Sequence, residues 1–192
     1  WANRGKEPDL RHLNRIMDYS FYWLDSVRNY YLYTGDAAFV SDIYPRMKTL
    51  AEFCLSRTDK DGFAAARAGD WIFVDWADMP KNGVLCVEQI LFARALAATA
   101  ECAEIAGEKS DAEKYSKLSA QLLEKTLKVF WDEEKGVLRH GVENGKFHEV
   151  RTRYAAMFAA LFGYLDSGRL EKVKRTTLLN DSVQKITTPY MR

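Results

Sequence analysis

The sequence is poor in the residue types that build metal centres and disulfide frameworks. Its 192 residues include only three cysteines and three histidines. Each cysteine stands alone within an apolar stretch, which indicates a small buried side chain and not a disulfide partner. The histidines show no metal-ligand spacing, so the sequence predicts neither a metal site nor a cofactor. These residues are Cys54, Cys86 and Cys102, with His12, His140 and His148.

The sequence also lacks an excess of charge of either sign. Its 28 basic and 27 acidic residues leave a formal net charge of +1, and the basic residues are scattered among the acids. A nucleic-acid partner is therefore not expected. No apolar run is long enough to span a membrane and no signal peptide is evident, so we expect a soluble protein without a membrane partner.

The chain has the length of one ordinary domain with a sizeable core. It starts at Trp1 without a methionine, and it ends at Arg192 within an apolar segment. We therefore expect residues 1–192 to form a partial domain, a fragment of a longer chain.

Apolar residues recur at helical spacing along most of the sequence. Gly35 stands where a left-handed residue would end the first helix, and Asp36 is placed to cap the second. Within the second helix, Pro45 predicts a break near Tyr44. The pattern predicts helices at residues 9–34, 36–56, 84–106, 111–131, 152–165 and 170–179.

Predicted helices that are apolar on several sides alternate with helices that carry one apolar stripe. Residues 9–34 and the alanine-rich residues 84–106 are of the first kind. Residues 111–131, which begin with a Ser110–Glu113 capping box, are of the second kind. Alternating inner and outer helices predict an all-α fold, an α/α toroid, with about half of a six-hairpin ring present.

Short turns follow the predicted inner helices, whereas long connections precede them. We therefore expect the long connections to gather at one mouth of the ring. One of them, between residues 136 and 148, contains an Asn144-Gly145 turn and predicts a small β-hairpin insertion. His140 and His148 are expected to be ordinary residues of this hairpin.

Another long connection, GDWIFVDWADMPKNG at residues 69–83, places tryptophans beside carboxylates. This combination suits a sugar, whose apolar face stacks on an indole while its hydroxyls donate to carboxylates. The alternative is a loop whose tryptophans plug the helical core and whose aspartates cap a helix. For a sugar site we expect Asp75 and Trp76 to point toward the ring axis, whereas Asp78 could equally cap the following turn.

Glu88 is a further acidic residue near the predicted mouth, one turn into the inner helix at residues 84–106. It could face the mouth, where the helix N-terminus stabilises a carboxylate. We favour the alternative, in which its carboxyl group forms a hydrogen bond to a neighbouring loop.

The amino-acid sequences of several segments resemble those of the catalytic six-hairpin barrel of bacterial α-L-rhamnosidases, glycoside hydrolase family 78. The main ones are DYSFYWLDSVRNYYLYTGDAAFVSDIYP at Asp18–Pro45 and WIFVDWADMPKNG at Trp71–Gly83. VFWDEEKGVL at Val129–Leu138 and ITTPYM at Ile186–Met191 fit the same family in the same order. The resemblance covers nearly the whole chain but only the middle of the family's catalytic domain.

The resemblance implies an enzyme that hydrolyses terminal α-L-rhamnose with inversion, using one carboxylic acid and one carboxylate. By the family pattern the acid lies upstream of this chain and the base downstream, so no catalytic residue is expected here. The implied partners are a rhamnose-containing carbohydrate and the rest of the same chain, which would complete the barrel. The implied pocket wall consists of Trp71, Asp75, Trp76 and Asp78, with Asp18 and Trp23 as weaker members.

Two other functions are compatible with these patterns. Where many members of the family have polar residues at the start of an inner helix, residues 152–156 are Thr-Arg-Tyr-Ala-Ala, so another six-hairpin glycosidase with a different sugar remains open. A helical-repeat scaffold that binds a protein would have a constant repeat and no aromatic loop. Because the loop lengths here vary widely, we favour the enzyme. Its compartment, the periplasm or the cytoplasm of a bacterium, stays open.

Overall fold

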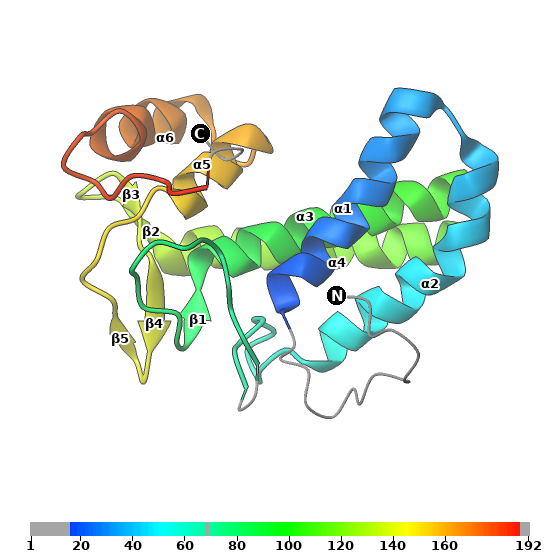
Figure 1. Cartoon of the computed structure of the whole chain (residues 1–192), viewed down its shortest axis with the longest axis horizontal. Helices are drawn as coiled ribbons and strands as arrows, with labels where there is room; N and C mark the ends of the chain where they lie inside the picture. Colours follow the sequence, from blue (N-terminus) through cyan, green and yellow to red (C-terminus); the bar gives the residue numbers. More distant parts are fainter. Residues whose placement is uncertain (1–15, 68–69, 189–192) are drawn as a thin grey trace, which may run out of the picture.

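A computed structural model describes residues 16–67 and 70–188, which are mainly helical (Figure 1). The last α-helix continues into a π-helical turn, η2, at Lys174–Leu178. No described helix is both long and apolar enough to cross a membrane. The described helices are α1 (Met17–Thr34), α2 (Ala37–Ser56), α3 (Cys86–Ile105), α4 (Lys109–Phe130), α5 (Tyr154–Leu161) and α6 (Ser167–Val173).

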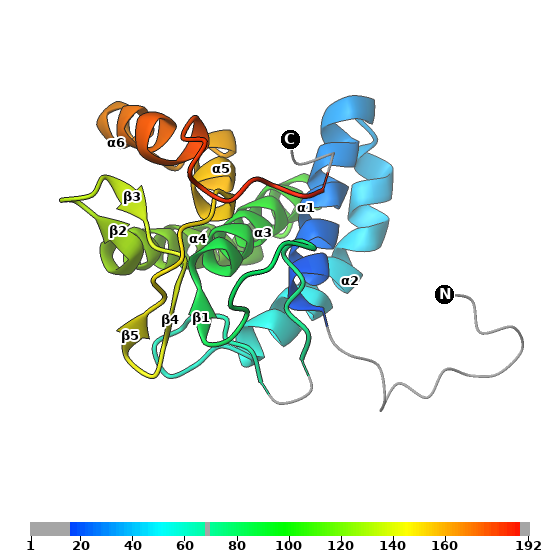
Figure 2. The same ribbon diagram turned by 60° about the vertical axis from the view of Figure 1, so that its left-hand side comes forward.

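These helices form three consecutive helical hairpins, α1–α2, α3–α4 and α5–α6. Residues 35–36 and 106–108 form the short turns of the first two hairpins, on the right of Figure 1. The strands and the segment after α6 lie on the left of the figure. Figure 2 shows the hairpins following one another around an arc. The predicted α/α toroid, with about half of a six-hairpin ring, is confirmed.

The burial of the helices distinguishes the inner from the outer layer. Helix α3 is buried along nearly its whole length, and it packs against α1, α2, α4 and α5. Helix α4 buries a single stripe, with Tyr115, Leu122 and Phe130 among its members. Residues three and four apart share one face of a helix, so α4 has one face toward the core and one outside. The predicted inner position of α3 and outer position of α4 are confirmed.

The first hairpin turn follows the predicted chemistry. Gly35 has a left-handed φ of 69°, and its N–H donates to Tyr31 O. The Asp36 carboxylate accepts from the N–H of Phe39 at 3.0 Å and caps α2. The predicted start of the first helix at residue 9 is not supported, because Ile16 is extended and α1 begins after it. Residues 9–15 lie outside the described part of the chain.

Pro45 does not break α2, contrary to the prediction. The helix continues from Ala37 to Ser56 with the proline inside it. Pro45 is exposed, whereas Tyr44 and Met47 on either side belong to the buried stripe of the same helix. Packing of this stripe against the core therefore outweighs the local cost of the proline.

The predicted capping box at Ser110 is also wrong. Helix α4 begins at Lys109, with Glu108 at its N-cap and no side-chain cap. Gly107 has a φ of 82°, and the N–H of Glu108 donates to Ala103 O at 2.8 Å. This closing turn of α3 is tight, so α4 starts before Ser110 can act as its cap.

Short strands border the long connections. β4 (Gly141–Glu143) and β5 (Lys146–Phe147) form the predicted hairpin, whose turn has positive φ at Asn144 and Gly145, and this prediction is confirmed. β1 (Val84–Leu85) pairs with β4, so the first two residues predicted as helix are a strand. β2 (Trp131–Asp132) and β3 (Val137–Leu138) form another hairpin.

The predicted boundaries of the last two helices were too wide or displaced. Helix α5 is confined to Tyr154–Leu161, because Gly163, at a φ of 70°, ends it. Helix α6 begins at Ser167, where Asp166 accepts from Arg169 N at 2.9 Å. The three cysteines are buried and free, as expected.

Candidate functional site

The long connections converge on the Asp75 carboxylate, which is fully buried. Its Oδ2 accepts from Tyr154 Oη at 2.6 Å and from the N–H groups of Thr187 at 2.8 Å and Thr188 at 3.2 Å. Its Oδ1 accepts from Trp76 N at 2.7 Å and from the Thr188 hydroxyl. Asp75 therefore ties its own loop to the start of α5 and to the segment that follows η2.

These donors also determine the charge of Asp75. Burial opposes its ionisation, but hydrogen bonds from Thr188, Tyr154 and the backbone outweigh burial and lower its pKa to about 2. The side chain is thus an ionised acceptor at neutral pH. Its oxygens are engaged by the chain itself, which makes it an anchor of the mouth.

His140 and Gln184 join the same connections at two further points. His140 Nε2 lies 2.7 Å from Pro80 O, and its Nδ1 lies 3.0 Å from Thr152 Oγ1. Burial lowers the pKa of His140, so the neutral ring donates through Nε2 and accepts through Nδ1. Gln184 donates to Asp78 O at 2.8 Å. These contacts give His140, which directly precedes β4, a structural role.

A strained turn separates the inward and outward side chains of the loop. Val74 has a φ of 51°, and the N–H of Asp75 donates to Phe73 O at 2.6 Å across it, as in a γ-turn. A β-branched residue rarely adopts this conformation. The Val74 N–H donates to Asp18 Oδ2 at 2.8 Å, so a buried carboxylate on α1 holds the turn.

Three exposed aromatic side chains surround the buried ring of Phe73. The ring of Phe73 meets Trp71 at 5.7 Å, Trp76 at 4.9 Å and Tyr19 of α1 at 5.9 Å between centroids, all edge to face. Lys81 Nζ lies 5.5 Å from the Phe73 centroid. Trp76 is 72% exposed and Trp71 39%, so neither tryptophan plugs the helical core. Tyr19, Trp71, Phe73 and Trp76 are called the aromatic cluster below.

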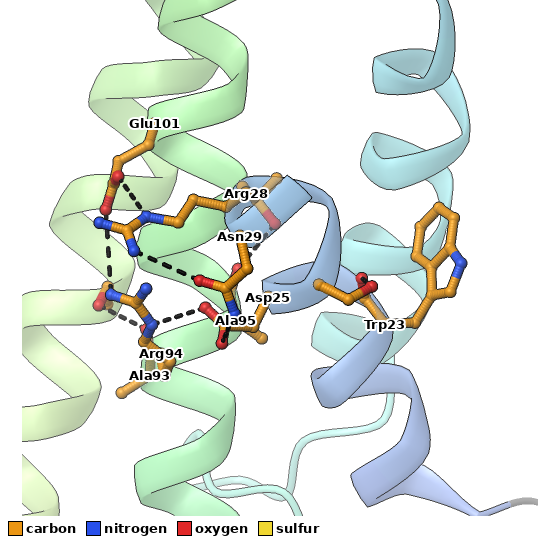
Figure 3. A network of polar contacts seen from close by, with 11 residues as sticks. Trp23, Asp25, Arg28, Asn29, Ala93, Arg94, Ala95 and Glu101 are labelled. Atoms are coloured by element: carbon orange, nitrogen blue, oxygen red, sulfur yellow. Dashed lines mark hydrogen bonds and ion pairs between the residues drawn. The ribbon is translucent and has the colours of Figure 1, made fainter. Parts of the chain in front are cut away.

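Trp23 lies apart from this cluster. A polar network fixes the neighbouring face of α1 against α3: Arg94 donates to Asp25 at 2.6 Å, and Arg28 donates to Glu101 at 2.7 Å. Figure 3 shows Trp23 on the opposite side of α1 from these residues.

The remaining predicted residues have contrasting environments. Asp78 is exposed, and the hydrogen bond it receives is to its backbone oxygen. Asp18 is buried at the base of the loop. The structure thus brings together Trp71, Trp76, Asp75 and Asp18, and their role in substrate binding stays a prediction.

Glu88 does not form the predicted hydrogen bond to a neighbouring loop. It is 2% exposed, and neither carboxyl oxygen has a hydrogen-bond partner among the described residues. Burial, together with the charge of Asp18, raises the pKa of Glu88 well above the ordinary glutamate range. A buried, neutral carboxylic acid therefore lies beneath the loop.

Several residues that build this mouth carry no clear signal in the sequence. Tyr154, Thr187 and Thr188 bind Asp75, yet they stand 79, 112 and 113 positions away from it. The only signal for Thr187 and Thr188 was the resemblance of the segment Ile186–Met191 to the family. Among the described residues, no group of three or more histidine, cysteine, aspartate and glutamate side chains is placed to bind a metal ion.

Comparison with known proteins gives consistent matches. The family model described as the bacterial alpha-L-rhamnosidase 6 hairpin glycosidase domain matches residues 8–188. A GH78-family rhamnosidase of Bacillus sp. GL1 has a similar crystal structure, with a TM-score of 0.82 and 25% identity over 93% of this chain. The chain spans 19% of that rhamnosidase. No curated protein matches the chain.

Proposed function

Because the chain belongs to the bacterial α-L-rhamnosidase six-hairpin glycosidase family, we propose that it is the central part of an enzyme that removes terminal α-L-rhamnose by inverting hydrolysis. The coarser function, a glycoside hydrolase, follows from the family. The observation that supports the finer proposal is the pair of exposed tryptophans in the aromatic cluster, Trp71 and Trp76, next to a buried and ionised Asp75.

The aromatic cluster has the properties that a deoxysugar requires. Rhamnose carries a methyl group in place of a hydroxymethyl group, so one side of its ring is more apolar than in most sugars. The exposed indole of Trp76 offers a surface on which that side would stack, worth about 1 kcal/mol beyond its burial. Asp78, two positions further on and exposed, would accept a hydrogen bond from a sugar hydroxyl.

The buried acids at this site are unsuited to the chemical step. Inverting hydrolysis uses two carboxyl groups roughly 6.5–9.5 Å apart on opposite sides of the sugar, and one of them must be protonated near neutral pH. Asp75 is ionised because its pKa is about 2. Asp18 and Glu88 are buried beneath the loop, where they have no access to a sugar. The proposed acid and base therefore belong to parts of the protein outside these residues.

The test of this function uses the full-length protein with a panel of aryl glycosides. We expect turnover of aryl α-L-rhamnosides, and NMR of the first product should reveal the inverted β-anomer of rhamnose. Turnover of another aryl glycoside with none of the rhamnoside would contradict the sugar assignment. Release of the α-anomer first would contradict inversion.

A different sugar is the second candidate, and it too rests on a specific observation. At the start of α5, the Tyr154 hydroxyl donates a hydrogen bond to Asp75, and Ala155 and Ala156 have no polar side chain. This helix start would then offer few hydrogen bonds to a sugar. The same panel of aryl glycosides distinguishes the two candidates.

A further inference from the structure

A small cavity lies beneath the loop that carries the aromatic cluster. Ile72 of that loop lines it, together with Gly83 and two ionisable residues, Arg57 and Glu88. It has about 10 Å³ of room for the centre of a water molecule, which is enough for one. The cavity is therefore large enough for a single ordered water, for which Glu88 and Arg57 are the polar side chains in an otherwise apolar lining.

Both ionisable residues reach the cavity with unused hydrogen-bonding atoms. Glu88 is only 2% exposed, and its two carboxyl oxygens have no hydrogen-bond partner among the described residues. Arg57 is also buried, and its Nε is without a partner in the same part of the chain. Buried polar groups are nearly always satisfied by protein or by ordered water.

We propose that this cavity binds one water molecule between Glu88 and Arg57, and that Glu88 is thereby a positioning residue for the loop that presents Trp71 and Trp76. The inference rests on the proposed function, because it concerns how the same binding surface is held. It adds a buried water site and a role for Glu88, whose side chain is buried beneath the loop.

The contacts of the cavity wall connect it to Trp71. Arg57 Nη2 donates to Asp70 Oδ2, and Asp70 immediately precedes Trp71. Ile72, which lines the cavity, immediately follows it. The backbone on both sides of Trp71 is therefore anchored at the cavity, so a change in what fills the cavity would reach the indole.

A second connection runs through α1 to the strained turn. Asp18 holds the Val74 N–H with Oδ2, while its Oδ1 has no partner among the described residues. Among the ionisable groups, Asp18 from α1 acts on Glu88, and Arg57 from the end of α2, which pairs with Asp70, lines the same cavity. Because Glu88 is neutral, it donates its O–H to the water, which also accepts from Arg57 Nε–H. Asp18 then remains beside a neutral group while it holds the turn.

Variants of the full-length protein test this arrangement. Glu88→Gln keeps a polar side chain of the same shape, so a crystal structure should retain the water and KM for an aryl α-L-rhamnoside should change less than about twofold. Glu88→Leu should expel the water, shift the tryptophan emission and raise KM up to about tenfold, the size of one aromatic contact, with kcat nearly unchanged. Glu104→Gln, an exposed position on the same helix, is the matched control.

The pH dependence of stability gives a readout that needs no substrate. Glu88 binds its proton more tightly in the folded state, so the free energy of unfolding should fall as the pH rises above about 4.3, the ordinary pKa of glutamate. Glu88→Gln should remove this part of the slope, and Glu104→Gln should keep it.

An empty cavity in a high-resolution structure of the wild type would overturn the water site. Unchanged emission and KM in Glu88→Leu would overturn the positioning role. If Glu88→Leu does not fold, an unaltered pH slope in Glu88→Gln would still contradict the inference. If the wild type acts on no rhamnoside, the proposed function fails, while the water, the emission and the pH slope still decide this inference.

Discussion

At the scale of single residues, Asp75 and Trp76 are neighbours with opposite roles. The Asp75 side chain is turned inward and accepts five hydrogen bonds from the chain, whereas the Trp76 side chain is exposed. The γ-turn at Val74 produces this division, because it reverses the backbone directly before Asp75. Asp75 therefore holds the loop in place, and Trp76 forms part of the proposed binding surface.

Trp76→Ala should weaken substrate binding more than it slows the chemical step. The substitution removes an exposed stacking surface and leaves the Asp75 contacts in place, so we expect KM for an aryl α-L-rhamnoside to rise about tenfold. Steady-state kinetics of the full-length protein measure this. Trp131→Ala, a partly exposed tryptophan on β2, should leave KM unchanged. A large loss of kcat at constant KM in Trp76→Ala would contradict the binding role.

Asp75→Asn should destabilise the protein and change its response to acid. The NH2 group of the asparagine would face the N–H and O–H donors that bind Asp75, which should lower the free energy of unfolding by about 2–3 kcal/mol. The wild-type pKa is depressed to about 2, so its ionised form stabilises the fold above the unfolded pKa and loses that effect as the pH falls toward 2. Urea unfolding across this range should reveal a weaker acid dependence in the variant. Equal stability of the two proteins at pH 7 would contradict it.

At the scale of elements, helix periodicity predicted the six helices and their inner and outer roles, because side chains on one face must be buried together. The sequence was less informative about helix ends. Pro45 stays inside α2 because the flanking buried stripe outweighs its local cost, and Ser110 is bypassed by the tight turn at Gly107. The partners of Asp75 could not be predicted, since no local pattern relates residues 112 positions apart.

Pro45→Ala should stabilise the protein. Pro45 is exposed on α2, so its replacement loses no buried contact, restores a backbone N–H donor and removes the clash of the ring with the preceding turn. We expect a gain of about 1–3 kcal/mol in the free energy of unfolding. Chemical denaturation measures it, with Arg46→Ala at the next exposed position as the control. A loss of stability would indicate that α2 requires the proline for its shape.

At the scale of the whole molecule, the three hairpins leave apolar side chains exposed. Leu32 is 58% exposed and Tyr33 is 92% exposed near the end of α1, and Leu179 after η2 is 77% exposed. Helix α1 also exposes Tyr19, Trp23 and Tyr30, and several exposed apolar side chains on one helix are typical of a surface that another part covers. We propose that the rest of the same chain completes the ring over them.

The isolated 192-residue chain should therefore self-associate and should not hydrolyse an aryl α-L-rhamnoside. Association covers the exposed apolar surface, and activity is absent because the proposed acid and base lie outside this chain. Sedimentation and a sensitive activity assay measure the two outcomes. A stable monomer would contradict the first expectation. Turnover by the isolated chain that is lost in Asp75→Asn would contradict the second.

The long-range hydrogen bonds of Asp75 have a consequence for the order of events during synthesis. Thr187 and Thr188 are translated 112 and 113 residues after the carboxylate that they bind. At about 5–20 residues per second, the ribosome needs roughly 5–20 s to deliver them. During that interval the tryptophan loop lacks its final anchor while its aromatic side chains are already outside the ribosome. The loop therefore becomes fixed only when Thr187 and Thr188, which follow the third hairpin, have emerged.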